Sequence, residues 1–213
     1  MLPESIPIFP LPNVVLFPNV FLPLHIFEPR YCQMFAEALA GDRMIGMVLL
    51  RPGYEADYQG RPPVYATGCS GLITHAERLD DGRYDVVLRG IEKFTIAHEE
   101  DTAVGRLYRI AVVTAEDEPV RDHERDELRR QRQRLEEVLA PLVRDKLQKY
   151  LPREMPDEDL VNALAQYLEF APIEKLALLQ QRGVVARCRS MVELLEMKAL
   201  SGSVNRDPGT VIH

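Results

Sequence analysis

Hydrophobic positions along the chain follow two different periods. Up to about residue 118, short apolar runs and the alternation of apolar with polar residues predict β-strands over residues 6–9, 20–27, 44–50, 64–78, 84–96 and 108–112. Beyond that point apolar side chains recur at helical spacing, as in Leu128, Leu135 and Leu139. The pattern predicts an α+β protein in which a β-rich part precedes a helical bundle.

One amphipathic helix interrupts the β-rich part. Pro29 suits the first position of a helix, and Gly41 suits the position just after its end. Between them, apolar side chains spaced three and four residues apart share one face: Tyr31, Met34, Phe35 and Ala38. We expect this face to fill the core of the β-rich part.

Turn chemistry and alternation locate a hairpin. Asp81-Gly82 is the strongest hairpin signal in the chain, because both residues tolerate the backbone conformation of a tight turn. Apolar residues alternate with others in two strands, and each alternation predicts one buried face. The two sets are Tyr84, Val86 and Leu88 after the turn, and Tyr108, Ile110 and Val112 in the last strand.

The change of period sets the expected domain boundaries. A charged stretch ends at Pro119, a helix breaker. We therefore expect a β-rich module over residues 1–118, a helical subdomain over 119–200 and a flexible tail over 201–213. Within the helical subdomain, Pro172 starts one helix and Gly183 separates it from the next.

Composition limits the classes of function. The chain has 213 residues, of which 46% are hydrophobic, and a net charge of −7. This balance is typical of a globular protein and unlike that of most nucleic-acid-binding proteins, which attract phosphates with a basic excess. The apolar stretch near the N-terminus is interrupted by five prolines, so it cannot form a membrane-spanning helix. We expect no nucleic-acid partner and no membrane association.

Motifs for catalysis are missing from the sequence. It contains no P-loop, no G-x-G-x-x-G and no H-E-x-x-H, and its three cysteines are far apart. We therefore predict no catalytic residues, no metal, no cofactor and a reducing, cytoplasmic location. One enzymatic alternative stays open, a hydrolase that uses Cys32 or Cys69 as nucleophile with a histidine such as His25.

Three segments stand out as long, specific motifs: residues 7–18 (PIFPLPNVVLFP), residues 22–31 (LPLHIFEPRY) and Gly90-Ile91-Glu92-Lys93-Phe94. Together with the helical part, they resemble the N-terminal, substrate-binding domain of Lon proteases. Lys93 stands where the family usually has arginine. If that arginine forks onto a carboxylate, lysine loses the two-pronged geometry.

The resemblance implies a β-rich module of PUA-like fold followed by a helical bundle. In full Lon proteases this region helps to recognise unfolded or tagged proteins, and the ATPase and Ser–Lys protease domains come after it. We expect a stand-alone form without either activity, so that an ATP-dependent protease name would rest on homology. Other PUA-like folds bind RNA, which gives a second alternative that the acidic balance disfavours.

The preferred hypothesis is a non-catalytic module that binds unfolded or extended polypeptides, as an adaptor in protein quality control with a protease or chaperone as partner. Its expected site is the Arg51 to Pro63 loop or a neighbouring sheet edge. This loop is longer than most, is expected to be flexible, and carries Tyr54 and Tyr58 as contact surface. The alternative for both tyrosines is that they pack back on the sheet.

Overall fold

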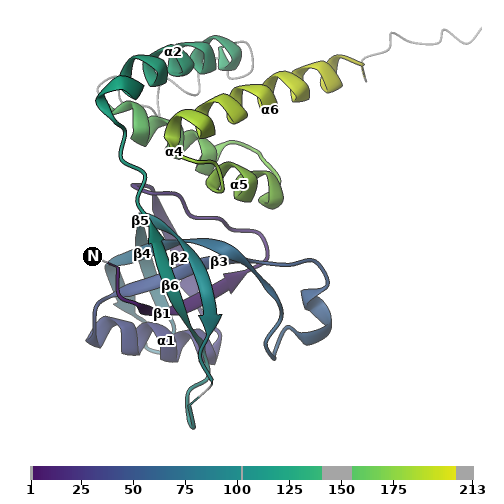
Figure 1. Ribbon diagram of the computed structural model, residues 1–213. Coiled ribbons are helices and arrows are strands. Elements are labelled where there is room, and N and C mark those ends of the chain that lie inside the picture. The colour runs from purple at the N-terminus through teal and green to yellow at the C-terminus, as the bar shows by residue number, and fades with distance from the viewer. Residues whose placement is uncertain (1, 102, 141–154, 205–213) are drawn as a thin grey trace, which may run out of the picture. The chain divides into compact units, whose positions relative to one another are not determined.

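A computed structural model describes residues 2–101, 103–140 and 155–204, the last four of them without side chains. The chain is an α+β protein with a six-stranded sheet, which confirms the predicted fold class (Figure 1). Residue contacts divide it into two compact units. The barrel unit comprises Met1–Glu118 and Asn162–Gln180, and the helical unit comprises Pro119–Val161 and Gln181–His213.

Five strands of the barrel unit close into a ring. The whole sheet has six strands: β1 (Ser5–Leu11), β2 (Phe21–Ile26), β3 (Met44–Leu50), β4 (Val64–Arg78), β5 (Tyr84–Glu99) and β6 (Arg109–Glu116). Pairing runs from β1 through β3, β4 and β5 to β6, which returns to pair with β1. Only β1 and β3 are parallel, because β2 and a helix carry the chain between them. β2 pairs with the first half of β5 and is an edge strand.

The predicted hairpin joins β4 and β5. Gly82 has a φ of 85°, a left-handed conformation that glycine adopts without steric cost. After the turn Tyr84, Val86 and Leu88 are buried, as their alternation predicts. The register of the two strands shifts between Cys69 and Gly71, opposite Gly90, and marks a β-bulge at this point.

The alternation in β6 predicts the wrong face for most of the strand. The fully buried residues of its core face are Ala111 and Val113, whereas Ile110 and Val112 are only half-buried. Ala111 and Val113 pack in a cluster with Ile6, Ile8, Val48 and Phe94. The larger apolar residues Ile110 and Val112 lie on the outer face of β6 and are half-buried there, so residue size does not mark the core face of this strand.

Phe94 fills the barrel where two glycines leave room for its ring. A Cβ atom on Gly68 would lie 2.6 Å from this ring, and one on Gly46 would lie 3.0 Å from it. Gly68 requires glycine, because a Cβ atom there would also lie 2.4 Å from the carbonyl oxygen of Met47, while a side chain at Gly46 would force Phe94 or Ile6 to shift. The glycines of β3 and β4 therefore allow the barrel to close around one aromatic side chain.

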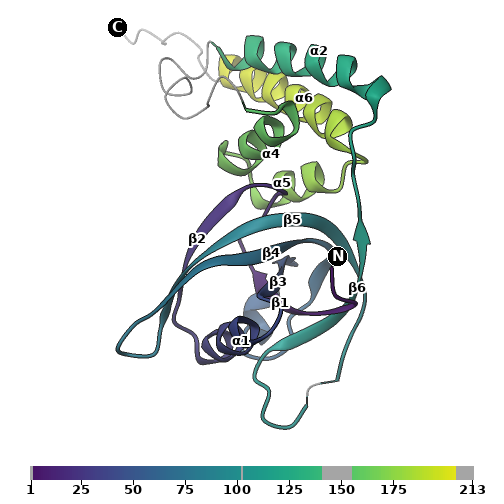
Figure 2. The same cartoon turned by 90° about the vertical axis from the view of Figure 1, so that its left-hand side faces the viewer.

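Helix α1 (Pro29–Ala40) lies beside β1 (Figure 2). It begins at Pro29 and is followed by Gly41, as predicted, and its buried residues are the predicted Tyr31, Met34, Phe35 and Ala38. The ring of Phe9 in β1 contacts both aromatic rings of this face, at centroid distances of 4.4 Å for Tyr31 and 5.8 Å for Phe35. These contacts fix the start of α1 against the strand.

Lys93 occupies the position at which the family usually has arginine. Its side chain is only 3% exposed, and its ammonium group lies 3.2 Å from Glu116 and 2.5 Å from Glu118. Lys93 therefore pairs with two carboxylates, Glu116 at the end of β6 and Glu118 just after it, as a point charge rather than as a two-pronged fork. This arrangement anchors the last residue of the barrel before the chain enters the helical unit.

The helices after β6 are α2 (Asp122–Leu139), α4 (Asp157–Tyr167), α5 (Pro172–Leu179) and α6 (Val184–Val204). In the helical unit α2 and α6 pack together, and Arg134 in α2 forms an ion pair of 2.7 Å with Glu196 in α6. α6 extends to Val204, so residues 201–204, which the sequence places in the tail, are helical. The remainder of the predicted tail lies outside the described residues.

Residues 162–180 belong by their contacts to the barrel unit. The Tyr167 hydroxyl donates a hydrogen bond of 2.8 Å to the carbonyl of Phe21, and Gln180 bonds Thr67 over 3.3 Å. The first division of the chain falls after Glu118. The organisation expected from the sequence, a β-rich module over residues 1–118 and a helical subdomain over 119–200, stays a prediction.

Replacing Phe35 by alanine should destabilise the barrel unit by about 2–5 kcal/mol, because the residue is completely buried and leaves a cavity. Urea unfolding followed by tyrosine fluorescence measures the change. Leu39→Ala is the control and should cost less, because Leu39 lies on the same helix but is only half-buried. A loss below about 1 kcal/mol for Phe35→Ala would contradict the assignment of this face to the core.

Candidate functional site

The loop between β3 and β4, residues 51–63, is an ordered element. Tyr54–Asp57 form a 3-10 helical turn, η1, and the amide of Arg51 donates a hydrogen bond of 2.9 Å to the carbonyl of Pro63 at the base of the loop. Side chains from β6 and α1 also bind its backbone carbonyls. These bonds tie the loop to its surroundings at three points, and the flexibility expected of it from the sequence stays a prediction.

Tyr58 packs against the start of α1. Its hydroxyl donates a hydrogen bond of 2.8 Å to Glu28, and the guanidinium of Arg30 lies 4.8 Å from the centre of its ring. Arg30 also donates to the Tyr58 carbonyl over 2.9 Å and forms an ion pair of 2.9 Å with Glu28. Burial and the bond to Glu28 raise the pKa of Tyr58, so its hydroxyl stays protonated and donating.

Tyr54, the other predicted contact residue, lies next to Tyr58, with 6.1 Å between the ring centroids. The structure therefore brings the two predicted tyrosines together. Both are half-buried, and Tyr58 packs on the Glu28-Pro29-Arg30 corner rather than on the sheet. Tyr58 contributes a ring face to the surface, whereas its polar group is already bonded.

A second arginine holds the far end of the loop. Arg109, the first residue of β6, donates to the carbonyl of Pro62 over 2.8 Å and grips Glu99, the last residue of β5, with two hydrogen bonds. Arg61 adds an ion pair of 2.9 Å to the same carboxylate. Burial alone would raise the pKa of Glu99, but the bonds and charges of Arg109 and Arg61 outweigh it and lower the pKa overall.

The loop between β5 and β6 forms the other wall. The side-chain amide of Gln33 in α1 donates to the carbonyl of Gly105 over 3.0 Å and accepts from the amide of Leu107 over 2.9 Å. The Tyr108 hydroxyl donates to Glu37 over 2.6 Å. Burial and this carboxylate raise the pKa of Tyr108 to about 12. Leu107, held in this way by its backbone, is 60% exposed.

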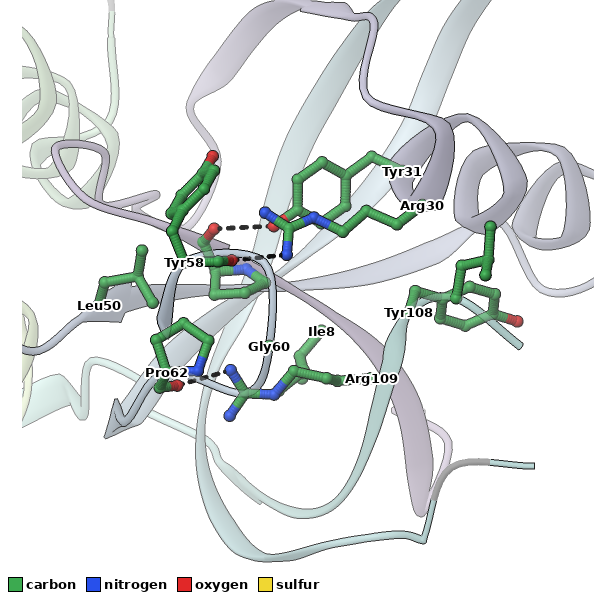
Figure 3. A pocket seen from close by; sticks show the side chains of 11 residues that line it. Ile8, Arg30, Tyr31, Leu50, Tyr58, Gly60, Pro62, Tyr108 and Arg109 are labelled. Atoms are coloured by element: carbon green, nitrogen blue, oxygen red, sulfur yellow. Dashed lines mark hydrogen bonds between the residues drawn. The ribbon is translucent and has the colours of Figure 1, made fainter. Parts of the chain in front are cut away.

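These two loops enclose a pocket (Figure 3). Arg30 and Arg109 approach the segment around Gly60 from opposite sides. The other lining residues are apolar or aromatic, apart from glycine: Ile8, Pro10, Tyr31, Leu50, Tyr58, Pro62, Leu107 and Tyr108. Among them only Tyr58 is a candidate from the sequence. A leucine within the polar loop before β6 is the signal that could have identified Leu107.

Geometry does not support the hydrolase alternative. Arg83 donates to Nε2 of His25 over 3.2 Å, and Nδ1 bonds Asp85 over 2.6 Å, so both ring nitrogens are engaged. The Cys32 thiol donates to the carbonyl of Ile26, and burial, together with the charge of Asp81, raises its pKa. A raised pKa opposes thiolate formation, which a nucleophilic cysteine requires. Cys69 is completely buried.

Among the residues that the structure describes, no three His, Cys, Asp or Glu side chains gather closely enough to hold a metal ion. Within those residues, no helix has the length and apolar character needed to cross a membrane. The small pocket flanked by these loops is thus a candidate binding feature, and its chemistry is that of recognition by rings, apolar groups and arginines.

The fold and the pocket define a binding module built on a small β-barrel with accompanying helices. Comparison with known families assigns it more closely: the model of the ATP-dependent protease La (LON) substrate-binding domain matches residues 5–197. The chain belongs to this family, which confirms the resemblance seen in the sequence. The matched domain is a non-catalytic part of those enzymes.

Relatives and solved structures agree with this assignment. The Lon protease of Desulfosudis oleivorans is 29% identical over 92 residues, which are 43% of this chain and 11% of that protein. The Lon protease of Roseiflexus castenholzii is 35% identical over 97 residues, 45% of this chain and 12% of that protein. The matched segment is thus about a tenth of the length of these relatives.

Two solved structures share the fold. The N-terminal domain of a Mycobacterium avium complex Lon protease has a TM-score of 0.66 at 16% identity, with 91% of this chain and 98% of that chain covered. A Lon N-terminal domain protein from Xanthomonas campestris has a TM-score of 0.58 at 21% identity, with 90% and 97% covered. At these identities the comparison establishes the fold alone.

Glu99→Gln should make the stability of the barrel unit less dependent on pH. The folded chain holds the pKa of Glu99 below its usual value, so the carboxylate stabilises the fold above its ordinary pKa of about 4.3. This stabilisation is lost as pH falls through the lowered pKa. We expect the variant to be less stable than the parent at pH 7 and the difference to shrink in acid. Thermal unfolding at a series of pH values measures it, and a difference that stays constant down to about pH 2 would contradict the prediction.

Proposed function

We propose that this chain is a polypeptide-binding module whose clients dock at the pocket between the 51–63 loop and the β5–β6 loop. The observation that supports the proposal most directly is the combination of exposed Leu107 with the ring of Tyr58 at one pocket. Apolar and aromatic groups on ordered loops offer contact area at low entropic cost. Membership of a substrate-binding domain family is consistent with this role.

The free edge of β2 is a poorer candidate, although an extended peptide could in principle add to it. Along an edge strand, residues whose backbone N–H and C=O groups point away from the sheet alternate with residues that pair with the neighbouring strand. Pro23 lacks the amide hydrogen that an added strand would need. The carbonyl of Phe21 already accepts the Tyr167 hydroxyl. These features protect the edge against indiscriminate pairing, which favours the pocket as the site.

The finer part of the proposal concerns the biological setting. We infer that the module acts without chemistry of its own, presents unfolded or extended polypeptides to a protease or chaperone, and works in the cytoplasm. The sequence lacks the nucleotide-binding motif that ATP turnover requires. The described cysteines and His25 are arranged for packing and hydrogen bonding rather than for nucleophilic attack.

Leu107→Ala should weaken client binding about three- to tenfold, because it removes apolar contact area from the rim without touching the backbone bonds that Gln33 makes. Fluorescence anisotropy with a labelled, permanently unfolded casein measures the affinity. The matched control is Val104→Ala, in the same loop, since Val104 is fully exposed and does not line the pocket. Equal losses for both variants, or none for Leu107→Ala, would exclude the pocket as the site.

The purified protein should not hydrolyse ATP, whether or not casein is present, and should not cleave casein, whether or not ATP is present. Phosphate release and gel analysis of the casein measure the two activities. A turnover that co-purifies with the chain and disappears on Cys32→Ser or Cys69→Ser would revive the hydrolase alternative. A turnover unaffected by either substitution would point to a contaminating enzyme.

A further inference from the structure

Part of β4 has no neighbouring strand on one of its two sides. β3 pairs with β4 as far as Leu72, and just beyond it the Ile73 amide donates a hydrogen bond of 2.8 Å to the carbonyl of Arg43. Among the described residues, β5 is the only strand that pairs with the remainder of β4, residues 74–78. These residues are the free edge of β4. Arg43 bounds it at one end, and the turn of the hairpin, which projects from the barrel, bounds it at the other (Figure 2).

Two residues of the free edge direct their backbone groups away from β5. The Leu79 amide donates a hydrogen bond of 2.9 Å to the carbonyl of Arg83, so these two residues are a hydrogen-bonded pair next to the turn. Hydrogen-bonded and non-bonded pairs alternate along an antiparallel ladder, so the N–H and C=O groups of Arg78 and Ala76 point outward. Outward backbone groups of this kind are a template to which another strand can add.

The edge of β2, on the other side of β5, differs from the free edge of β4. It contains Pro23, which has no amide hydrogen, and its Phe21 carbonyl already accepts the Tyr167 hydroxyl. The free edge of β4 contains no proline. Within the described chain, no other segment bonds the outward groups of Ala76 or Arg78. Of these two edges, only that of β4 therefore has its outward backbone groups available.

Charged side chains form an incomplete row across the outer face of this sheet. Glu77 in β4 lies opposite Asp85 in β5, and Asp85 lies opposite His25 in β2. The His25 ring contacts the Asp85 carboxylate over 2.6 Å. Two like charges directly opposite each other are unfavourable, and an imidazole offsets them on the β2 side alone. In the described part of the chain, the Glu77 side chain has no hydrogen bond or ion pair, so the row ends on a carboxylate at the free edge.

A second copy of the free edge matches the first about a two-fold axis. Ala76 is the midpoint of residues 74–78, so two antiparallel copies overlap over their full length when Ala76 lies opposite Ala76. The backbone groups of Ala76 point outward and exchange two hydrogen bonds across the axis. The same register places Glu77 opposite His75 of the other copy, once on each side of the axis. His75 is exposed, and an imidazole can donate a hydrogen bond to a carboxylate in either protonation state.

Neighbouring registers are less favourable. With Glu77 on the axis, its carboxylate would lie opposite the same carboxylate of the other copy. With His75 on the axis, Arg78 would lie beside Leu72 of the other copy, where β3 already occupies the space. The length of the edge, the direction of its backbone groups and its charges thus select one register independently of each other.

We propose that the chain forms a two-fold symmetric dimer through the free edge of β4, in which the outer sheets of two barrel units join into one. A second copy is the partner because its edge supplies the imidazole that Glu77 lacks. The edge is short, so the dimer is weak, with a dissociation constant on the order of 100 µM. None of residues 74–78 lines the pocket, so dimerisation leaves it open and the inference does not depend on the proposed function.

Sedimentation velocity of the whole chain, from about 10 µM to about 1 mM, tests the proposal, and the sedimentation coefficient should rise toward that of a dimer. His75→Glu places a carboxylate opposite Glu77 twice in the interface, so it should weaken the dimer at least about tenfold. Adding Glu77→Lys to this variant sets an ammonium group opposite each new carboxylate and should restore the dimer. The matched control is His98→Glu, an exposed position in β5 outside the free edge, which should dimerise like the parent.

Ala76→Pro tests the backbone bonds, because proline is tolerated on an edge strand but removes the central donor. This variant should stay monomeric at every concentration, and circular dichroism checks that it folds. If it does not fold, the charge exchange between His75 and Glu77 decides by itself.

Three results would overturn the proposal. The parent could remain monomeric at the highest concentration. A dimer that survives both Ala76→Pro and His75→Glu would use another surface, and a double variant that fails to dimerise would exclude the register centred on Ala76. If the parent is monomeric and Ala76→Pro weakens casein binding, the edge accepts a client strand in place of a second copy.

Discussion

The paired bonds between Arg109 and Glu99 are the interaction on which the site depends. Glu99 ends β5 and Arg109 begins β6, so the pair closes the base of the loop between these strands. A third nitrogen of the same arginine donates to the carbonyl of Pro62, in a loop far away in sequence. One side chain thereby fixes both walls of the pocket relative to each other, with Arg30 holding the 51–63 loop at a second point.

Local signals in the sequence are sufficient for most elements of the barrel. The proline and glycine at the ends of α1, its apolar face and the Asp81-Gly82 turn are properties of neighbouring residues, and the structure has them all. The buried face of β6 does not follow from its own residues, because its burial depends on pairing with β1 and β5, which are distant in the chain. Alternation measures the hydrophobicity of a face, not whether other strands cover it.

The site is predictable only in part for the same reason. The length and tyrosines of the 51–63 loop draw attention to one wall of the pocket. The second wall consists of Leu107 and Tyr108, and the charged lining comes from α1 and β6. Nothing near Arg30 or Arg109 in the sequence indicates that each donates to a carbonyl of the 51–63 loop, Arg30 to that of Tyr58 and Arg109 to that of Pro62. Such long-range contacts between polar side chains and backbone leave no periodic pattern.

The amide of Gln33 determines how this protein can vary without losing its pocket. It bonds backbone atoms of Gly105 and Leu107, so it holds this part of the loop in place independently of the side chains that the loop carries. Residues before Gly105, including fully exposed Val104, lie outside that grip. A change of side chain before Gly105 therefore leaves both bonds intact, whereas an insertion between Gly105 and Leu107 would separate the two backbone groups that one amide holds together.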